Sequence, residues 1–166
     1  MLILKVESAL NDQIAKEGYA SNAYLAMASW CDHKGLRGIA SFFYTQSEEE
    51  RAHMLKLVKY VNEAGGHALM SAIKAPILQY KSIKDIFQTS FEQEKDVTKS
   101  INQLVELTFG LKDYASYNFL EWYVAEQHEE ENLFRSILDL IKIGGDEGTS
   151  LLILDMEIPK LRAKKE

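Results

Sequence analysis

The chain has 166 residues and a net charge of −6, and 46% of its residues are hydrophobic and 27% charged. These values are typical of a soluble protein, and we expect residues 1–166 to form a single domain. The acidic balance argues against nucleic acid and anionic membranes as partners, and the lone Cys31 excludes an intrachain disulfide framework and a Cys-x-x-Cys pair.

The N-terminus lacks the apolar run and cleavage site of a signal peptide, and no later stretch approaches the roughly 18 apolar residues that a membrane span needs. We therefore expect a cytoplasmic location.

Helical periodicity predicts long helices over residues 5–34, 37–65, 83–110 and 113–143. Glycines follow three of these stretches, as is common where helices end. Only a few residues join the first helix to the second and the third to the fourth, so each pair should form an antiparallel hairpin.

Residues 67–82 lie between the two hairpins. At about 3.3 Å per residue this segment can extend beyond about 50 Å, whereas a 28-residue helix is about 42 Å long. It can therefore cross the whole bundle. The sequence predicts an all-α, four-helix bundle with one long crossover loop, in which the helices run up, down, down and up.

A short fifth helix is expected after Gly148 and before Pro159. Its apolar side, formed by Leu151, Leu152 and Leu154, needs cover, and we expect other subunits of a homo-oligomer to provide it. The basic residues beyond, Lys160, Arg162, Lys164 and Lys165, are expected to form a solvated terminus.

The inward face of each long helix is mainly apolar, but polar residues interrupt every one near its midpoint. The interrupting residues are Glu17, Glu50, His53, Glu94, Gln127 and Glu130. In an antiparallel bundle the helix midpoints share one level, so these groups should meet inside the core. Any one of them alone would more often be an ordinary buried polar group, but all of them at one level is difficult to explain that way.

Four buried carboxylates need compensating charge, and no Lys or Arg lies on the same helix faces. Two divalent ions would neutralise them. Glu50 and His53, spaced i, i+3, can share one ion with Glu17, and Gln127 and Glu130 repeat the spacing with Glu94 opposite. Carboxylate and imidazole ligands suit iron, manganese or zinc, and iron is favoured because an oxygen-rich site stabilises Fe(III).

More acidic residues lie one step away from these inward faces, at the same level. They are Glu49 on the second helix and Glu126 and Glu129 on the fourth. From spacing alone, they could form a third, outer metal site or only a solvated acidic surface.

These features resemble the motifs of bacterial non-haem ferritins over essentially the whole chain. The matching segments are Glu17, EEERAHM (48–54), Glu94 within FEQEKD, and FLEWYVAEQHEEENLF (119–134). The resemblance implies a ferritin-like fold and a ferroxidase, in which dioxygen or peroxide oxidises two Fe(II) ions bound by the six midlevel residues. It also implies iron storage as a ferric mineral inside a shell of 24 subunits.

The resemblance assigns further residues. It implies a third iron site formed by Glu49, Glu126, Glu129 and Glu130, and it places Tyr24 beside the di-iron centre. Trp122 matches a nearby tryptophan of the family. Either ring could supply an electron, although simple packing is an equal alternative for Trp122.

Two departures from relatives argue against haem. Haem-binding bacterioferritins have a methionine where this chain has Arg51, and Glu-x-x-His where it has Gln127-x-x-Glu130. We predict no haem, although Met54 is formally a possible axial ligand besides its expected role in packing. The two carboxylates of animal ferritin pores align with Tyr117 and Leu120, which leaves the route of iron entry open.

Two other functions fit a four-helix bundle. A di-iron oxygenase or peroxide reductase would act on a substrate without storing product, but it usually needs an open cavity or an electron-transfer module. A non-catalytic signalling or scaffold bundle should have apolar faces at midlevel, and these faces are polar there.

Overall fold

The computed structural model describes residues 2–162, and this range contains five α-helices. They are α1 (Leu4–His33), α2 (Arg37–Glu63), α3 (Ile83–Gly110), α4 (Tyr114–Gly144) and α5 (Gly148–Arg162). The predicted all-α class is confirmed. The largest error in the four long helices is at the end of α2, predicted at residue 65 and found at Glu63.

Local signals explain the ends of the helices. Gly35 follows α1 with a φ of 81°, and Gly65 follows α2 with the same value, a conformation that is unfavourable for residues with a Cβ. At the start of α4, the Asp113 side chain accepts a hydrogen bond from the backbone N–H of Ser116 at 3.2 Å. Gly35 and Asp113 therefore lie at the turns of the two hairpins, and Gly65 ends α2 where the crossover begins.

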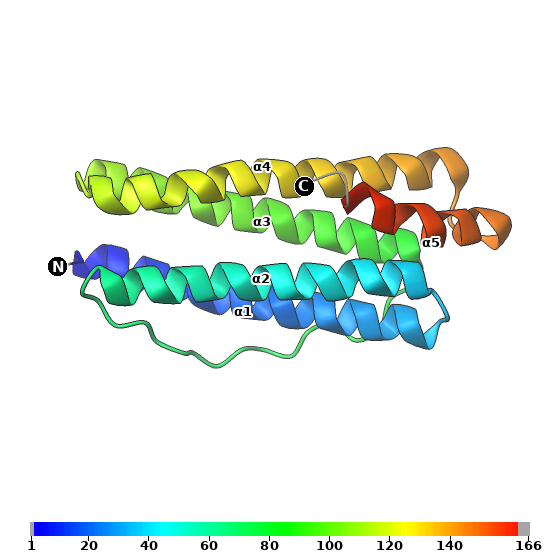
Figure 1. Cartoon of the computed structure of the whole chain (residues 1–166), viewed down its shortest axis with the longest axis horizontal. Helices are drawn as coiled ribbons and strands as arrows, with labels where there is room; N and C mark the ends of the chain where they lie inside the picture. Colours follow the sequence, from blue (N-terminus) through cyan, green and yellow to red (C-terminus); the bar gives the residue numbers. More distant parts are fainter. Residues whose placement is uncertain (1, 163–166) are drawn as a thin grey trace.

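The long crossover joins the two hairpins as predicted. Residues 64–82 leave α2 at one end of the bundle, run along the outside of the α1–α2 hairpin and reach α3 at the opposite end (Figure 1). As a result α2 and α3 point in the same direction, which is the up, down, down, up order. Asn11 of α1 holds the start of the crossover, accepting a hydrogen bond from Leu69 N at 2.7 Å and donating one to His67 O at 3.0 Å.

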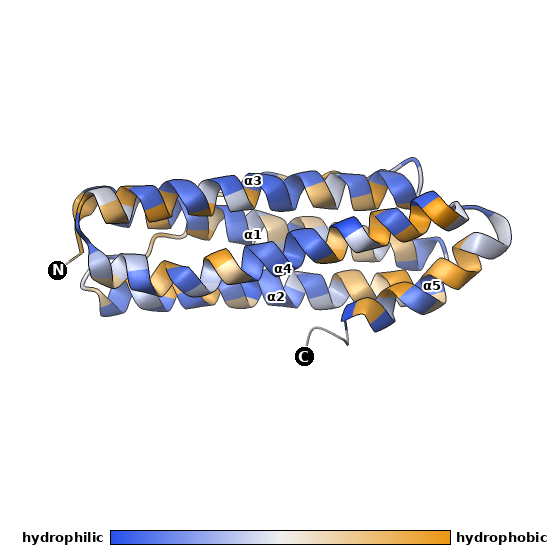
Figure 2. Ribbon diagram, turned by 90° about the horizontal axis from the view of Figure 1, so that it is seen from above, coloured by the Kyte–Doolittle hydropathy of each residue, from blue (hydrophilic) through white to orange (hydrophobic). Residues whose placement is uncertain are grey.

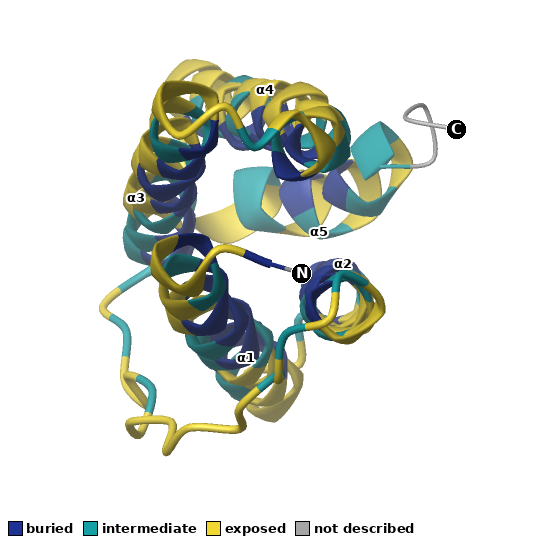
Figure 3. Ribbon diagram, turned by 90° about the vertical axis from the view of Figure 1, so that its left-hand side faces the viewer, coloured by how far each residue is buried: buried dark blue, intermediate teal, exposed yellow. Residues whose placement is uncertain are grey.

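The buried faces of the long helices turn toward one another (Figure 3), and they form two apolar clusters. One contains Phe42, Phe43, Phe87 and Phe134. The other contains Leu10, Leu57, Ile101 and Leu120. Buried polar residues lie between these clusters along the bundle, where an uninterrupted core would have apolar ones. This arrangement confirms the expectation that the bundle is polar at midlevel.

Helix α5 packs on α2 and α4, crossing between them, and it runs from the end of α4 back toward the middle of the bundle (Figures 1 and 3). The end of α4 beside it and much of α5 itself are hydrophobic (Figure 2). Leu154 and Ile158 are buried within the subunit. Residues of the same chain therefore bury Leu154, contrary to our expectation that other subunits would cover it. Leu152, by contrast, is 61% exposed.

The prediction that this helix stops before Pro159 was also wrong, because α5 continues to Arg162. Proline has no N–H to donate, so the carbonyl of Asp155, four residues earlier, loses its helical partner. That carbonyl faces Gly38 of α2 so closely that a Cβ on Gly38 would overlap its oxygen. The Asp155 side chain also accepts a hydrogen bond from Ile39 N at 2.8 Å, capping the start of α2.

The basic residues at the C-terminus do not all behave as a solvated end. Lys160 is exposed, but the Arg162 side chain is only 11% exposed and lies inside the bundle. Lys164 and Lys165 lie outside the described residues. Within residues 2–162, no helix is both long and apolar enough to cross a membrane.

Candidate metal centre

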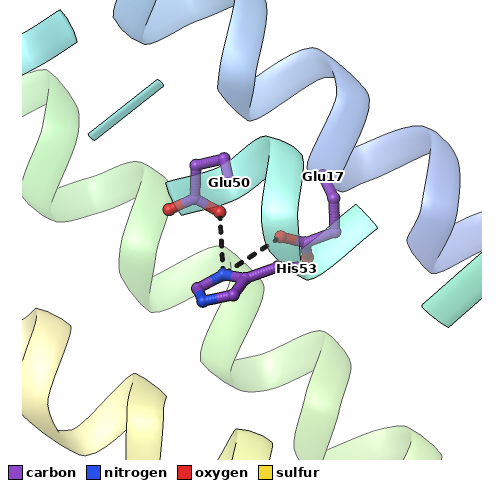
Figure 4. A group of neighbouring side chains, drawn as sticks. All are labelled: Glu17, Glu50 and His53. Atoms are coloured by element: carbon purple, nitrogen blue, oxygen red, sulfur yellow. Dashed lines mark ion pairs between the residues drawn. The ribbon is translucent and has the colours of Figure 1, made fainter. Parts of the chain in front are cut away.

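Glu17 of α1 meets Glu50 and His53 of α2 in the buried polar layer (Figure 4). The His53 Nδ1 atom is 3.4 Å from Glu50 Oε2 and 3.9 Å from Glu17 Oε2. One ligand atom from each residue lies within 4.8 Å of the others. This geometry allows the three side chains to hold one metal ion between them.

Glu94 of α3 and Gln127 of α4 adjoin one another in the same layer. The Gln127 amide donates to Glu94 Oε2 at 3.1 Å. Glu130 follows one turn later on α4 and is fully buried. The predicted midlevel side chains therefore converge in one buried layer, although their service as ligands stays a prediction.

Burial and crowding give these carboxyl groups unusual proton affinities. Burial raises the pKa of Glu17 well above its ordinary value, and the charge of Glu50 adds to the effect. Burial also raises the pKa of Glu50, with a further contribution from Glu94. The pKa of Glu94 rises from 4.5 to about 8 because of burial and the charge of Glu130. Without cations, the site therefore retains protons that a metal must displace.

Tyr24 lies directly beside the layer. Its hydroxyl donates a hydrogen bond to Glu94, and its ring stacks on Phe43 and Phe134 with centroids 5.9 Å apart in each case. Burial and the charge of Glu94 raise the pKa of Tyr24 well above 10, so the phenol stays protonated and remains a donor. On the other side, the ring of Trp122 lies 5.4 Å from that of His53.

A second acidic group lies between α2 and α4. Ligand oxygens of Glu49, Glu126 and Glu130 come within 4.8 Å of one another. Glu49 and Glu126 are half-buried and Glu130 is buried, whereas Glu129 is exposed on α4, outside this group. We call Glu49, Glu126 and Glu130 the outer cluster. Glu130 also belongs to the buried layer, so the outer cluster is continuous with the inner site.

The sequence reasoning missed two glutamines that hold the inner carboxylates. Gln13 donates to Glu17 Oε1 at 2.5 Å, and Gln46 donates to Glu130 Oε2 at 2.8 Å and to Glu50 Oε1 at 3.2 Å. Each stands four residues before a glutamate on its own helix, and residues at this spacing are neighbours on a helix surface. That Gln-x-x-x-Glu repeat was the signal available in the sequence.

A balancing positive charge comes from outside the four long helices. On those helices Arg51 and Lys95, the sequence neighbours of Glu50 and Glu94, are exposed. Arg162, however, arrives from α5, pairs with Glu49 and donates a hydrogen bond to Gln46. One positive charge therefore reaches the outer cluster from a residue far away in the sequence.

Comparison with known proteins agrees with this architecture. The model of the ferritin-like domain matches residues 7–143. A probable bacterial non-heme ferritin-like protein of Haemophilus influenzae is 48% identical, covering 99% of both chains. A bacterial non-heme ferritin of Campylobacter jejuni is 44% identical over 100% of this chain and 99% of its own.

Solved structures show the same similarity. An open pore ferritin from the archaeon Archaeoglobus fulgidus superimposes with a TM-score of 0.93 at 39% sequence identity, covering 95% of this chain and 96% of its own. The sequence, the fold and the buried carboxylate layer all agree with this likeness, and the chain belongs to the ferritin family.

Proposed function

We propose that this protein is a ferroxidase that oxidises Fe(II) as part of the iron storage that its family membership supports. The observation that carries the proposal is the buried convergence of Glu17, Glu50 and His53 beside Glu94 and Glu130. Such a concentration of carboxyl groups in a core is unfavourable unless cations or protons neutralise it. Two Fe(II) ions would do so and would be oxidised there.

Each group has a role in this proposal. Glu17, Glu50 and His53 hold one Fe(II), while Glu94, Gln127 and Glu130 hold the second. Gln13 and Gln46 fix the carboxylates through their amide N–H groups, which leaves other oxygen lone pairs for the metal. Each Fe(II) gives one electron to dioxygen or peroxide. A third iron ion binds at the outer cluster, and Glu129, which is exposed next to Glu130, is the remaining proposed ligand. Tyr24 orients Glu94 and can supply an electron.

The proposed function also includes the domain organisation, the absence of haem, the location and the assembly of the protein. We infer that residues 1–166 act as a single domain without haem in the cytoplasm, and that 24 copies form a shell that holds ferric mineral. Met54, the formal axial ligand, packs against the second apolar cluster, which supports a structural role. Relatives named as bacterial non-heme ferritins support the absence of haem.

One cavity in the described part of the chain bears on the alternative of a substrate-oxidising di-iron enzyme. A cavity of about 650 Å³ lies between α1, the crossover and α3, and its lining includes Lys16, Tyr19, Lys74 and Ser100. The proposed ligands are not among its lining residues in the described part of the chain. An organic substrate in this cavity would therefore not touch the metal ions.

Tyr117 and Leu120 align with the pore carboxylates of animal ferritins, and this difference leaves the route of iron entry open. Leu120 is fully buried in the second apolar cluster. Its side chain packs inside the subunit, so we do not assign the entry route to this pair.

The direct test compares aerobic Fe(II) oxidation by the wild type and by Glu50→Ala, followed through ferric absorbance. Exposed Glu48, two residues earlier on α2, provides the matched control Glu48→Ala. We expect at least about a tenfold slower initial rate for Glu50→Ala, because even outer partners of metal ligands change affinity or activity about 10- to 100-fold. Equal initial rates for the three proteins would refute the proposal.

A further inference from the structure

Arg162 is an unusual residue for the end of a helix, because its charge is placed inside the protein. Its guanidinium lies 5.5 Å from the centre of the Phe42 ring and donates a hydrogen bond to Gln46 Oε1. Burial lowers the pKa of Arg162 to about 10, so the side chain remains charged at neutral pH. A buried charge of this kind needs a partner.

That partner belongs to the proposed outer metal site. Arg162 pairs with Glu49 Oε2, and Glu49 shares the outer cluster with Glu126 and Glu130. The same guanidinium contacts Gln46, whose amide bonds to both Glu50 and Glu130. The positive charge of Arg162 thus lies against a carboxylate that would also bind a metal ion in the outer cluster.

We propose that Arg162 is a tethered counter-cation of the outer cluster, which a metal ion must displace, so that filling this site releases the C-terminal turn of α5. The inference rests on the proposed outer site. We expect the metal ion to displace Arg162 because both are cations. A guanidinium and a divalent ion within a few ångströms of one carboxylate repel each other in a partly buried, low-dielectric setting.

The end of α5 is suited to such release. Pro159 removes one backbone hydrogen bond from the last turn. Helix ends generally detach more easily than helix interiors. By contrast, Leu154, Asp155 and Ile158 anchor the preceding turns through buried apolar contacts and the hydrogen bond to Ile39. The last turn can therefore leave while the rest of α5 stays docked.

Zinc, which undergoes no oxidation, provides the probe. Calorimetric titration of the assembled protein with Zn(II) would compare wild type, Arg162→Gln and Lys160→Gln. Lys160 is the matched control, since it lies on the same turn but is exposed and pairs with Glu157 at 2.6 Å. Glu49→Gln identifies the outer-site binding event, because only that event should be lost.

We expect Arg162→Gln to tighten Zn(II) binding at the outer site by about fivefold or more, the lower range for coupled sites. Lys160→Gln should leave it unchanged, and Arg162→Lys should retain part of the competition because it keeps the charge. Unchanged or weaker affinity in Arg162→Gln overturns the proposal, as does a Glu49→Gln protein that retains every Zn(II) event.

Hydrogen exchange gives a second readout, which tests the wild-type protein itself. Zn(II) loading of the wild type should accelerate exchange of the amides of residues 160–162, with no acceleration in Glu49→Gln. No change in the wild type would also overturn the proposal. These measurements involve no oxidation, so their failure would leave the ferroxidase function of the inner site intact.

Discussion

At the scale of single residues, the layer between the two apolar clusters depends on hydrogen bonds that orient carboxylates. Gln13 fixes Glu17, Gln46 fixes Glu50 and Glu130, and Tyr24 fixes Glu94. A ligand that is already oriented loses less freedom when metal binds. We therefore expect Gln13, Gln46 and Tyr24 to increase metal affinity without contacting the metal.

Tyr24→Phe tests this role. In the wild type, the Tyr24 hydroxyl donates a hydrogen bond to Glu94 and stabilises the charged form of this carboxylate. The substitution removes that hydroxyl. A hydrogen bond to a charged group contributes about 1.5–3 kcal/mol, so metal affinity should fall by about tenfold or more. Anaerobic Fe(II) titration measures the change.

Tyr44→Phe is the matched control, because Tyr44 donates to Asp32 at 2.9 Å on the exposed surface. Its affinity should equal that of the wild type. If both variants bind Fe(II) like the wild type, Tyr24 does not position Glu94.

The raised carboxyl pKa values predict how pH affects the metal-free protein. The pKa of Glu94 rises from 4.5 to about 8 on folding, so between these values the folded state holds more protons than the unfolded state. The stability contributed by this protonated carboxyl is complete below pH 4.5 and is lost as pH rises through about 8. Denaturant unfolding of metal-free protein should show the decline, and Glu94→Gln should reduce its slope.

Metal should change this behaviour. Because metal binds the deprotonated ligands, affinity should increase with pH and binding should release protons. Unfolding of Zn(II)-loaded protein over the same pH range provides the comparison. Identical pH profiles with and without Zn(II) would contradict a metal site in this layer.

At the scale of helices, α2 and α5 contact one another so closely that adding a single methyl group between them should lower stability. In Gly38→Ala the new Cβ overlaps the carbonyl oxygen of Asp155. Overpacking of this kind typically destabilises a protein by about 1–3 kcal/mol, so we expect a lower thermal midpoint and partial undocking of α5.

Gly110→Ala is the control, because a Cβ on Gly110 at the end of α3 meets nothing within 4 Å. Its thermal midpoint should be equal or higher, since alanine favours helices over glycine. A Gly38→Ala protein as stable as Gly110→Ala would show that the α2–α5 contact can adjust freely.

The sequence predicted the long helices well and α5 less well, for a physical reason. Periodicity and glycine stops are local signals, and they define helices such as α1 and α4 almost to the residue. The position of α5 depends on contacts between distant residues, such as Asp155 with Ile39 and Arg162 with Glu49. Nothing in the spacing of residues 148–162 indicates those partners.

The same difference applies to the site. Spacing on each helix placed Glu17, Glu50, His53, Glu94, Gln127 and Glu130 in one layer, because antiparallel helices align their midpoints. Spacing left the outer cluster ambiguous, and the structure brings Glu126 to Glu49 but leaves Glu129 exposed. Tertiary packing of α2 against α4, which spacing does not encode, decides this difference.

At the scale of the whole molecule, α5 leaves apolar surface for a partner. Leu152, Ile153 and Met156 are 61%, 54% and 59% exposed. Contiguous exposed apolar residues commonly mark interfaces between proteins. They support our proposal that copies of this chain assemble through α5.

Native mass spectrometry tests the assembly. We expect a species of 24 copies for the wild type and smaller species for Leu152→Lys combined with Met156→Lys, because buried unpaired charges oppose association. Circular dichroism should show unchanged helix content in the variant. A monomeric wild type would contradict the proposed shell while leaving the inner site untested by this experiment.

Anomalous diffraction from crystals soaked in Fe(II) without oxygen would show directly whether the buried layer binds iron. We expect two iron peaks in each bundle, one among Glu17, Glu50 and His53 and one among Glu94, Gln127 and Glu130. Iron only on the outer surface, with none in this buried layer, would refute the di-iron site.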